Sequence, residues 1–118
     1  MRTQFRGVTG AMMDELTDSV SIFAADPKYA SFRSFLSLKG FDPRRVVIVD
    51  IIPEQECEVI TVAAGGYVVR FDLARDDKTA SDFVLYELRK FVNNGSRGKS
   101  LRSRVRAAVS ILNNLQLP

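Results

Sequence analysis

Residues 58–73 read EVITVAAGGYVVRFDL, and this stretch decides the fold. Two apolar runs flank Gly65 and Gly66, and paired glycines supply the positive φ angles that a tight hairpin turn requires. The turn therefore predicts two antiparallel strands, at about 58–64 and 67–74.

The same turn predicts which residues face one another across the hairpin. Side chains alternate between the two faces of a strand, so every second pair lies on the same face. One face is apolar except at its end, with the pairs Ala64 and Tyr67, Val62 and Val69, Ile60 and Phe71, and Glu58 and Leu73. The opposite face mixes Thr61, Arg70 and Asp72 with apolar residues, so we expect it to be the wetter face.

Another strand is predicted upstream of the hairpin, at about 45–52, because Val46 to Ile52 is rich in β-branched residues. Two helices are predicted before it. The first spans about 10–24, where apolar residues recur at helical spacing, and residues 1–8 form a flexible arm before it. Asp26 and Pro27 suit the start of the second helix, and Gly40 suits its end.

Two further helices are predicted after the hairpin. Thr79 is a candidate cap for the first, which would bury an apolar stripe at Val84, Leu88, Phe91 and Val92. The second begins near Ser100, and its apolar seam consists of Leu101, Val105, Ala108, Leu112 and Leu115.

These elements predict a single α+β domain over residues 1–118. Its core is a three-stranded antiparallel sheet, with two N-terminal and two C-terminal helices packed on one face. The composition suits a globular chain of one domain, since 46% of the 118 residues are hydrophobic and 26% are charged.

The strand at 45–52 is apolar on both faces, although a simple meander places it at an edge of the sheet. Proteins cover or pair such an edge. Either a helix or loop covers this strand, or the strand order differs, or a second molecule pairs with it. We therefore consider Val47, Val49 and Ile51 a candidate surface for a protein partner or for a homodimer.

Several reaction classes lack the residues they need. The chain has no histidine, which excludes catalytic triads and histidine-ligated metal sites. Its one cysteine, Cys57, lies among glutamates that raise a thiol pKa, so it is a poor nucleophile. We predict no catalytic residues, no metal and no cofactor.

The aspartates offer the one remaining route to catalysis, through Mg²⁺. The candidates are Asp50, Asp72, Asp76 and Asp77. The element order resembles, in outline, the core of the restriction-endonuclease-like nucleases, which implies a Mg²⁺-dependent hydrolase. Their third strand carries an acid-x-Lys pattern, and no lysine occurs at 67–74. Structural roles are the alternative: Asp50 would pair with Arg70, and Asp72 with a basic neighbour.

Positive charge gathers at the C-terminal end. Seven basic residues and no acidic ones follow Glu87, although the whole chain carries a net charge of only +3. They are Arg89, Lys90, Arg97, Lys99, Arg102, Arg104 and Arg106. Such a segment suits nucleic acid or another anion, or it pairs with the acidic body of the same chain. Free N–H groups at the start of the last helix also suit a phosphate, unless this is an ordinary solvated loop.

We expect a small non-enzymatic binding protein that acts through protein–protein contact, as an inhibitor, an immunity-type protein or a regulatory module. The alternative is a nucleic-acid-binding protein that uses residues 89–106, and a Mg²⁺-dependent hydrolase comes third. No signal peptide or membrane span is visible, so we expect no membrane partner and a cytoplasmic location.

Overall fold

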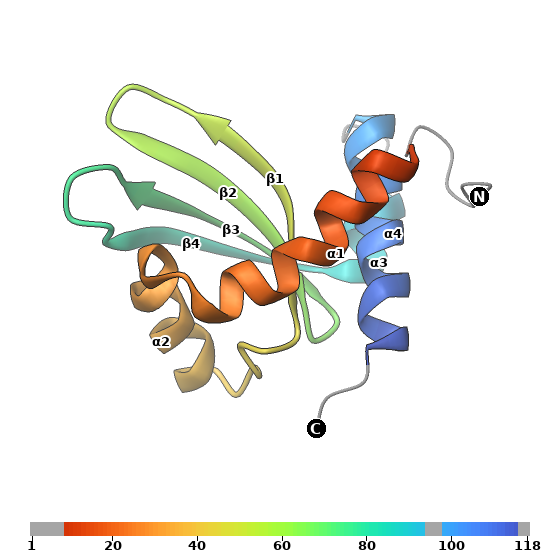
Figure 1. Ribbon diagram of the computed structural model, residues 1–118, viewed down its shortest axis with the longest axis horizontal. Coiled ribbons are helices and arrows are strands. Elements are labelled where there is room, and N and C mark those ends of the chain that lie inside the picture. The colour runs from red at the N-terminus through yellow and green to blue at the C-terminus, as the bar shows by residue number, and fades with distance from the viewer. Residues whose placement is uncertain (1–8, 94–97, 116–118) are drawn as a thin grey trace.

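The computed structural model describes residues 9–93 and 98–115. Its elements are α1 (Gly10–Ala25), η1 (Pro27–Tyr29), α2 (Ala30–Leu38), β1 (Val46–Pro53), β2 (Cys57–Ala64), β3 (Tyr67–Ala74), β4 (Ala80–Glu87), α3 (Leu88–Asn93) and α4 (Lys99–Asn114). Figure 1 shows α1 crossing the end of the sheet where α3 and α4 gather, with α2 below β4. No helix in the described ranges is long and apolar enough to cross a membrane.

The central hairpin has the predicted register. Ala64 lies opposite Tyr67, and the pairing continues in step to Cys57 opposite Ala74. Gly65 and Gly66 have φ angles of 49° and 83°, the left-handed conformation that the turn requires.

The end of α2 is as predicted, whereas its start is later than predicted, because residues 27–29 form η1 and α2 begins at Ala30. The Asp26 carboxylate accepts a hydrogen bond from the Lys28 amide, so it caps the short helix η1 that leads into α2. At the far end Gly40 has a φ of 88°, and the amide of Phe41 donates to the carbonyl oxygen of Leu36. These contacts form the Schellman motif that stops the helix.

The prediction of three strands is wrong, because residues 80–87 form a fourth strand and not the start of a helix. The sheet is a meander in the order β1-β2-β3-β4, and α3 begins only at Leu88. The run from Phe83 to Tyr86 is aromatic and β-branched, which suits a strand. Asp82 has a φ of 56° and lies at a bulge in β4. The bulge breaks the alternation of side chains between the two faces of the strand, so the sequence does not show the two-residue repeat that is typical of a strand.

Helices cover both faces of the sheet, whereas one face was predicted. Alternate residues of β1 belong to two separate hydrophobic clusters: Val46 and Ile48 pack in one with Phe32 of α2, and Val47 and Val49 pack in the other with Val105 of α4. Because alternate residues point to opposite faces, the two clusters lie on opposite sides of the sheet.

Helix α1 covers the outer edge of β1. Its Leu16 and Val20 join the cluster on the α4 side, while Phe23 joins the cluster on the α2 side. Between them, buried Ser19 accepts a hydrogen bond at 2.9 Å from the amide of Ile48. Of the three alternatives for this strand, the described structure has the first, a helix that covers the edge.

Candidate protein-binding edge

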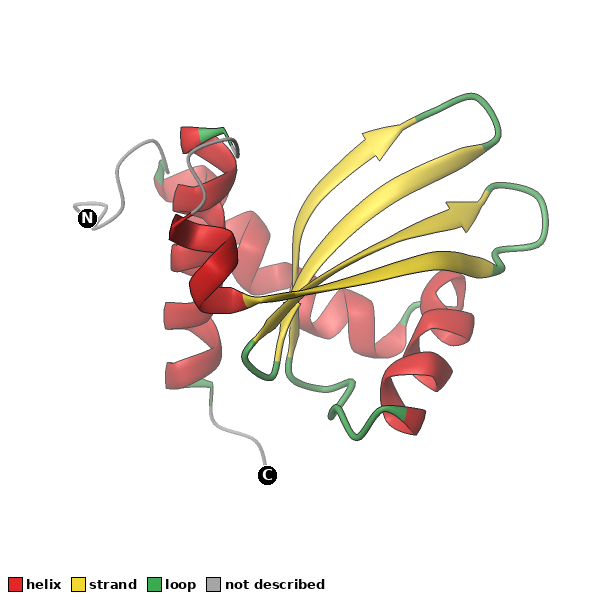
Figure 2. Cartoon of the chain, turned by 180° about the vertical axis from the view of Figure 1, so that it is seen from behind, coloured by secondary structure: helices red, strands yellow, loops and turns green. Residues whose placement is uncertain are grey.

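In the described structure, the other edge of the sheet, formed by β4, has no strand on its outer side. Among the described residues, β4 pairs with β3 alone. Figure 2 shows the molecule from behind, and the C-terminal part of β4 passes in front of the other strands there. Within the described residues, this part of the strand therefore has one edge that no other strand pairs with.

The hydrogen-bond pattern identifies the backbone groups that point outward from β4. The amide of Leu88 donates to the carbonyl oxygen of Gly66 at 3.0 Å. Bonded and non-bonded pairs alternate along an antiparallel ladder, so Glu87 and Leu85 lie in non-bonded pairs, opposite Tyr67 and Val69. The N–H and C=O groups of Leu85 and the N–H group of Glu87 therefore point away from β3, whereas the Glu87 carbonyl accepts the first hydrogen bond of α3, which begins at Leu88.

Apolar side chains accompany these groups. Val84 and Leu85 are 42% and 39% exposed, and as neighbours on a strand they lie on opposite faces of the sheet. The start of β4 is less open, because the amide of Ala80 donates to the Ser31 hydroxyl and Phe83 stacks on Phe35 at 3.8 Å. The accessible segment is therefore 84–87.

The predicted partner strand, β1, is less accessible. The side chains of Val47 and Val49 are fully buried in the chain itself, and exposure on β1 is confined to its end, where Ile51 and its neighbour Ile52 are 38% and 45% exposed. Beyond Ile51 the strand ends at Pro53, which has no amide hydrogen to donate. Ser19 and Pro53 together protect β1 in the ways that natural edge strands use.

The candidate basic residues divide between α3 and two sides of α4. Arg89 and Lys90 lie exposed on α3, and Lys90 is 3.4 Å from Glu87. The guanidinium of Arg106, on α4, contacts the carbonyl oxygen of Val92 on α3 at 3.4 Å. Arg102 lies one turn before Arg106, and its Nε is buried without a hydrogen-bond partner among the described residues.

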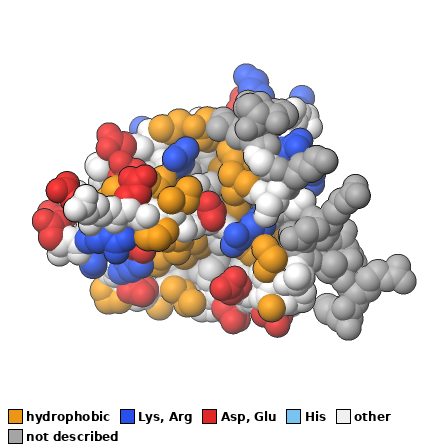
Figure 3. Space-filling view, turned by 90° about the horizontal axis from the view of Figure 1, so that it is seen from above, with side chains coloured by type: hydrophobic (Ala, Val, Ile, Leu, Met, Phe, Trp, Pro, Cys, Tyr) orange, Lys and Arg blue, Asp and Glu red, His pale blue; other side chains and the backbone are white. Residues whose placement is uncertain are grey.

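The remaining basic candidates do not extend this group within the described residues. Arg104 reaches the sheet and lies 3.8 Å from Asp50. Arg97 lies outside the described residues, and so does the side chain of Lys99, the first residue of α4. On the face seen from above, most basic side chains of the described residues lie beside acidic or apolar ones (Figure 3).

The predicted pairing of Asp50 with Arg70 is wrong. A bulge between Ile48 and Asp50 places two residues of β1 opposite Thr61, so Asp50 faces α4 and Arg104. Arg70 lies opposite Thr61 on the next strand, two strand spacings from Asp50.

The predicted basic partner for Asp72 is also wrong. Its carboxyl group lies beside Asp82, where burial and then the hydrogen bond and charge of Asp82 raise its pKa. Arg70 opposes this effect only weakly. Partial burial and the charges of Asp72 and Glu54 also raise the pKa of the Cys57 thiol.

The aspartates do not assemble a cation site in the described structure. Asp76 and Asp77 accept hydrogen bonds from backbone amides of their own turn, those of Asp77 and Thr79. Within the described ranges, no three acidic or cysteine side chains are placed to hold one metal ion.

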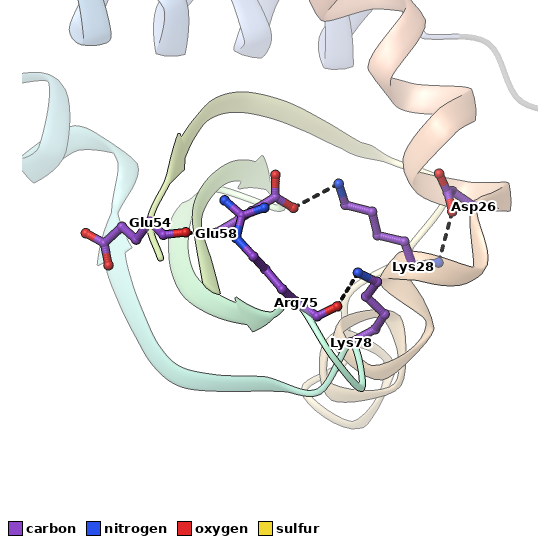
Figure 4. Close-up of polar contacts among 6 residues, drawn as sticks. All are labelled: Asp26, Lys28, Glu54, Glu58, Arg75 and Lys78. Carbon is purple, nitrogen blue, oxygen red and sulfur yellow. Dashed lines mark hydrogen bonds and ion pairs between the residues drawn. The ribbon is translucent and has the colours of Figure 1, made fainter. Parts of the chain in front are cut away.

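A polar cluster at the far end of the sheet has a structural role. Figure 4 shows Lys28 of η1 pointing to Glu58 of β2, 2.9 Å away, while Arg75 and Lys78 bind backbone oxygens of the adjoining turns. The cluster joins η1 to one hairpin and the two hairpin tips to each other.

No match to this chain is found among protein-family models, curated proteins or solved structures. The candidate site therefore depends on the geometry of β4. Sequence reasoning missed this edge because it assigned Val84 to a helix. The available signal was the run of β-prone residues from Phe83 to Tyr86.

Proposed function

We propose that this chain is a small non-enzymatic binding protein, located in the cytoplasm, that binds a protein partner by adding a strand to β4. The outward groups of Leu85 and Glu87 supply backbone hydrogen bonds, and the side chains at 84 and 85 supply apolar contact. Strand addition draws its affinity from such main-chain bonds and its specificity from the alternating side chains.

The observation that carries the proposal is the contrast between the two edges of the sheet. At β1, the Ser19 hydroxyl already accepts from the outward amide of Ile48, and Pro53 has no amide hydrogen to offer, so the exposed side chains of Ile51 and Ile52 accompany a shorter open segment. At β4, residues 84–87 combine outward backbone groups with two exposed apolar side chains. Unpaired backbone N–H and C=O groups along an edge strand form a template that a strand of another chain can pair with.

Affinity capture with the immobilised full chain tests the proposal. Leu85→Lys changes the edge, and Leu38→Lys is the matched control, since Leu38 is an 86% exposed leucine on α2. We expect a protein from a source-cell extract to be retained at stoichiometric amounts by the wild type and by Leu38→Lys, and to be lost from Leu85→Lys. Equal retention by all three chains, or no specific retention, would contradict the proposal.

Nucleic-acid binding is a second candidate function, favoured by the contact between Arg106 and α3. This contact brings Arg106 to the helix that carries Arg89, and Arg102 lies one turn before Arg106 on α4. Arginines of this kind neutralise phosphates, and binding then weakens steeply with salt.

Fluorescence anisotropy with a mixed pool of short RNA and DNA tests this second candidate. The double variant Arg102→Glu/Arg106→Glu should lose salt-sensitive binding, while the control Lys39→Glu/Arg44→Glu, with the same change in charge, should keep it. An absence of binding by the wild type at low salt would remove this candidate.

A further inference from the structure

We infer that the partner of β4 is a second copy of this chain, paired antiparallel to form a continuous eight-stranded sheet. This inference rests on the proposed function and names the partner. Two identical strands can pair antiparallel about a two-fold axis, which gives the closed, self-complementary interface that most homodimers use.

The outward backbone groups select the register. A hydrogen-bonded pair in the new ladder needs an outward N–H and an outward C=O on each residue, and within 84–87 Leu85 offers both, because the Glu87 carbonyl is used by α3. An axis at Glu87 would set two carboxylates against each other, and an axis at Tyr86 would set Leu85 against Glu87 twice. An axis at Leu85 sets this leucine against itself, and Val84 against Tyr86 of the second copy.

Charge along β4 supports the same arrangement. Asp82 lies near the start of the strand, whose preceding turn is neutral overall, and beyond Glu87 the strand leads into basic Arg89 and Lys90 of α3. In the antiparallel arrangement, Asp82 of one copy lies beside the basic end of the other. A parallel arrangement would place like charges together at both ends.

Sedimentation equilibrium of the full chain over a wide concentration range tests the self-pairing. We expect a transition from the 13.2 kDa monomer to a species of twice that mass. Leu85→Lys should weaken the dimer at least tenfold, and Arg89→Glu/Lys90→Glu should weaken it severalfold. Leu38→Lys and Lys39→Glu/Arg44→Glu are the matched controls and should leave the dimer unchanged. Circular dichroism identifies any variant that has not folded.

Disulfide trapping tests the register without weakening the interface. In a Cys57→Ser background, Leu85→Cys places two thiols opposite each other across the axis, at a Cα separation of about 5.5 Å, which a disulfide spans. Val84→Cys places them two residues out of step, at more than about 7 Å, which a disulfide does not span. We expect covalent dimers from Leu85→Cys and not from Val84→Cys.

The outcomes separate this inference from the proposed function. A wild-type chain that stays monomeric at every concentration would overturn the self-pairing, and so would a dimer that Leu85→Lys leaves intact. If the capture experiment still shows retention that depends on Leu85, a different protein binds β4 and the proposed function stands. If that retention is absent too, both fail.

Discussion

Single side chains determine which backbone N–H and C=O groups at the sheet edges remain free to pair with another strand. Ser19 is buried, donates to the carbonyl oxygen of Leu16 and accepts from the amide of Ile48. A buried amide without a partner costs free energy, so this one hydroxyl both joins α1 to β1 and closes the β1 edge.

Ser19→Ala should lower the free energy of unfolding by roughly 1–3 kcal/mol, because it leaves the buried amide of Ile48 unsatisfied. Chemical denaturation measures the change. The control is Ser34→Ala, which removes an exposed hydroxyl that bonds within its own helix and should change stability by less than about 0.5 kcal/mol. Equal effects of the two variants would contradict the account of Ser19.

Gly65→Ala should destabilise the protein more than Gly66→Ala, by roughly 1 kcal/mol or more. Both positions have positive φ, so both variants pay a similar backbone cost. At Gly65 a Cβ would also approach the ring of Phe41 to 2.8 Å, whereas at Gly66 it would meet open space. Thermal unfolding of the two variants measures the difference, and the reverse order would contradict the placement of Phe41.

Asp72→Asn should stabilise the protein at neutral pH, by roughly 0.5 kcal/mol, because it removes a like-charge contact with Asp82. The folded-state pKa of Asp72 is raised above its ordinary value of 3.8, so the wild type loses stability as pH rises from about 4 through that pKa. The advantage of the variant should therefore vanish below about pH 4.

Denaturation at several pH values measures this dependence. Asp14→Asn, an exposed change on α1, controls for the loss of one negative charge. An advantage of Asp72→Asn that is the same at pH 3 and pH 7 would contradict a raised pKa.

At the scale of elements, the sequence predicts structure well where local signals agree. The paired glycines and the alternation around them predict the β2–β3 ladder from Ala64 opposite Tyr67 to Glu58 opposite Leu73, and Gly40 with Phe41 predicts the end of α2. The same reasoning fails at β4, because the bulge at Asp82 breaks the period of two just where Val84 and Leu88 mimic a helical stripe.

Contacts between elements far apart in the chain are the second limit on what the sequence can predict. The bulge in β1 turns Asp50 toward Arg104, more than fifty residues along the chain, and a bulge leaves little trace in residue type. The candidate binding edge was missed for the same reason: it became visible only once residues 80–87 were placed in the sheet.

Proline substitutions test the hydrogen-bond pattern of β4. The amide of Val84 points toward β3 and that of Leu85 points away, so Val84→Pro should cost roughly 1 kcal/mol more than Leu85→Pro. Chemical denaturation of the two variants measures the difference. A larger cost for Leu85→Pro would reverse the inward and outward assignment on which the binding edge depends.

At the scale of the whole molecule, the arrangement of the helices leaves the two sheet edges unequal. Helix α1 crosses the β1 edge between the two hydrophobic clusters, while α2 and α3 flank the two ends of β4 (Figure 1). The segment 84–87 is thus framed by helices and, in the described structure, has no strand on the side away from β3. The central claim is that α1 covers the edge at β1, whereas the outer side of residues 84–87 of β4 is open in the described structure. Both the proposed function and the self-pairing depend on this difference.

Amide hydrogen exchange of the full chain, followed by NMR, tests this claim most directly. In dilute solution the amides of Leu85 and Glu87 should exchange rapidly, while the amide of Ile48, bonded to Ser19, should exchange slowly. Raising the concentration of the chain, or adding its partner, should then slow exchange at Leu85 and Glu87. Amides at Leu85 and Glu87 that are as protected as Ile48 in dilute solution would contradict an open β4 edge.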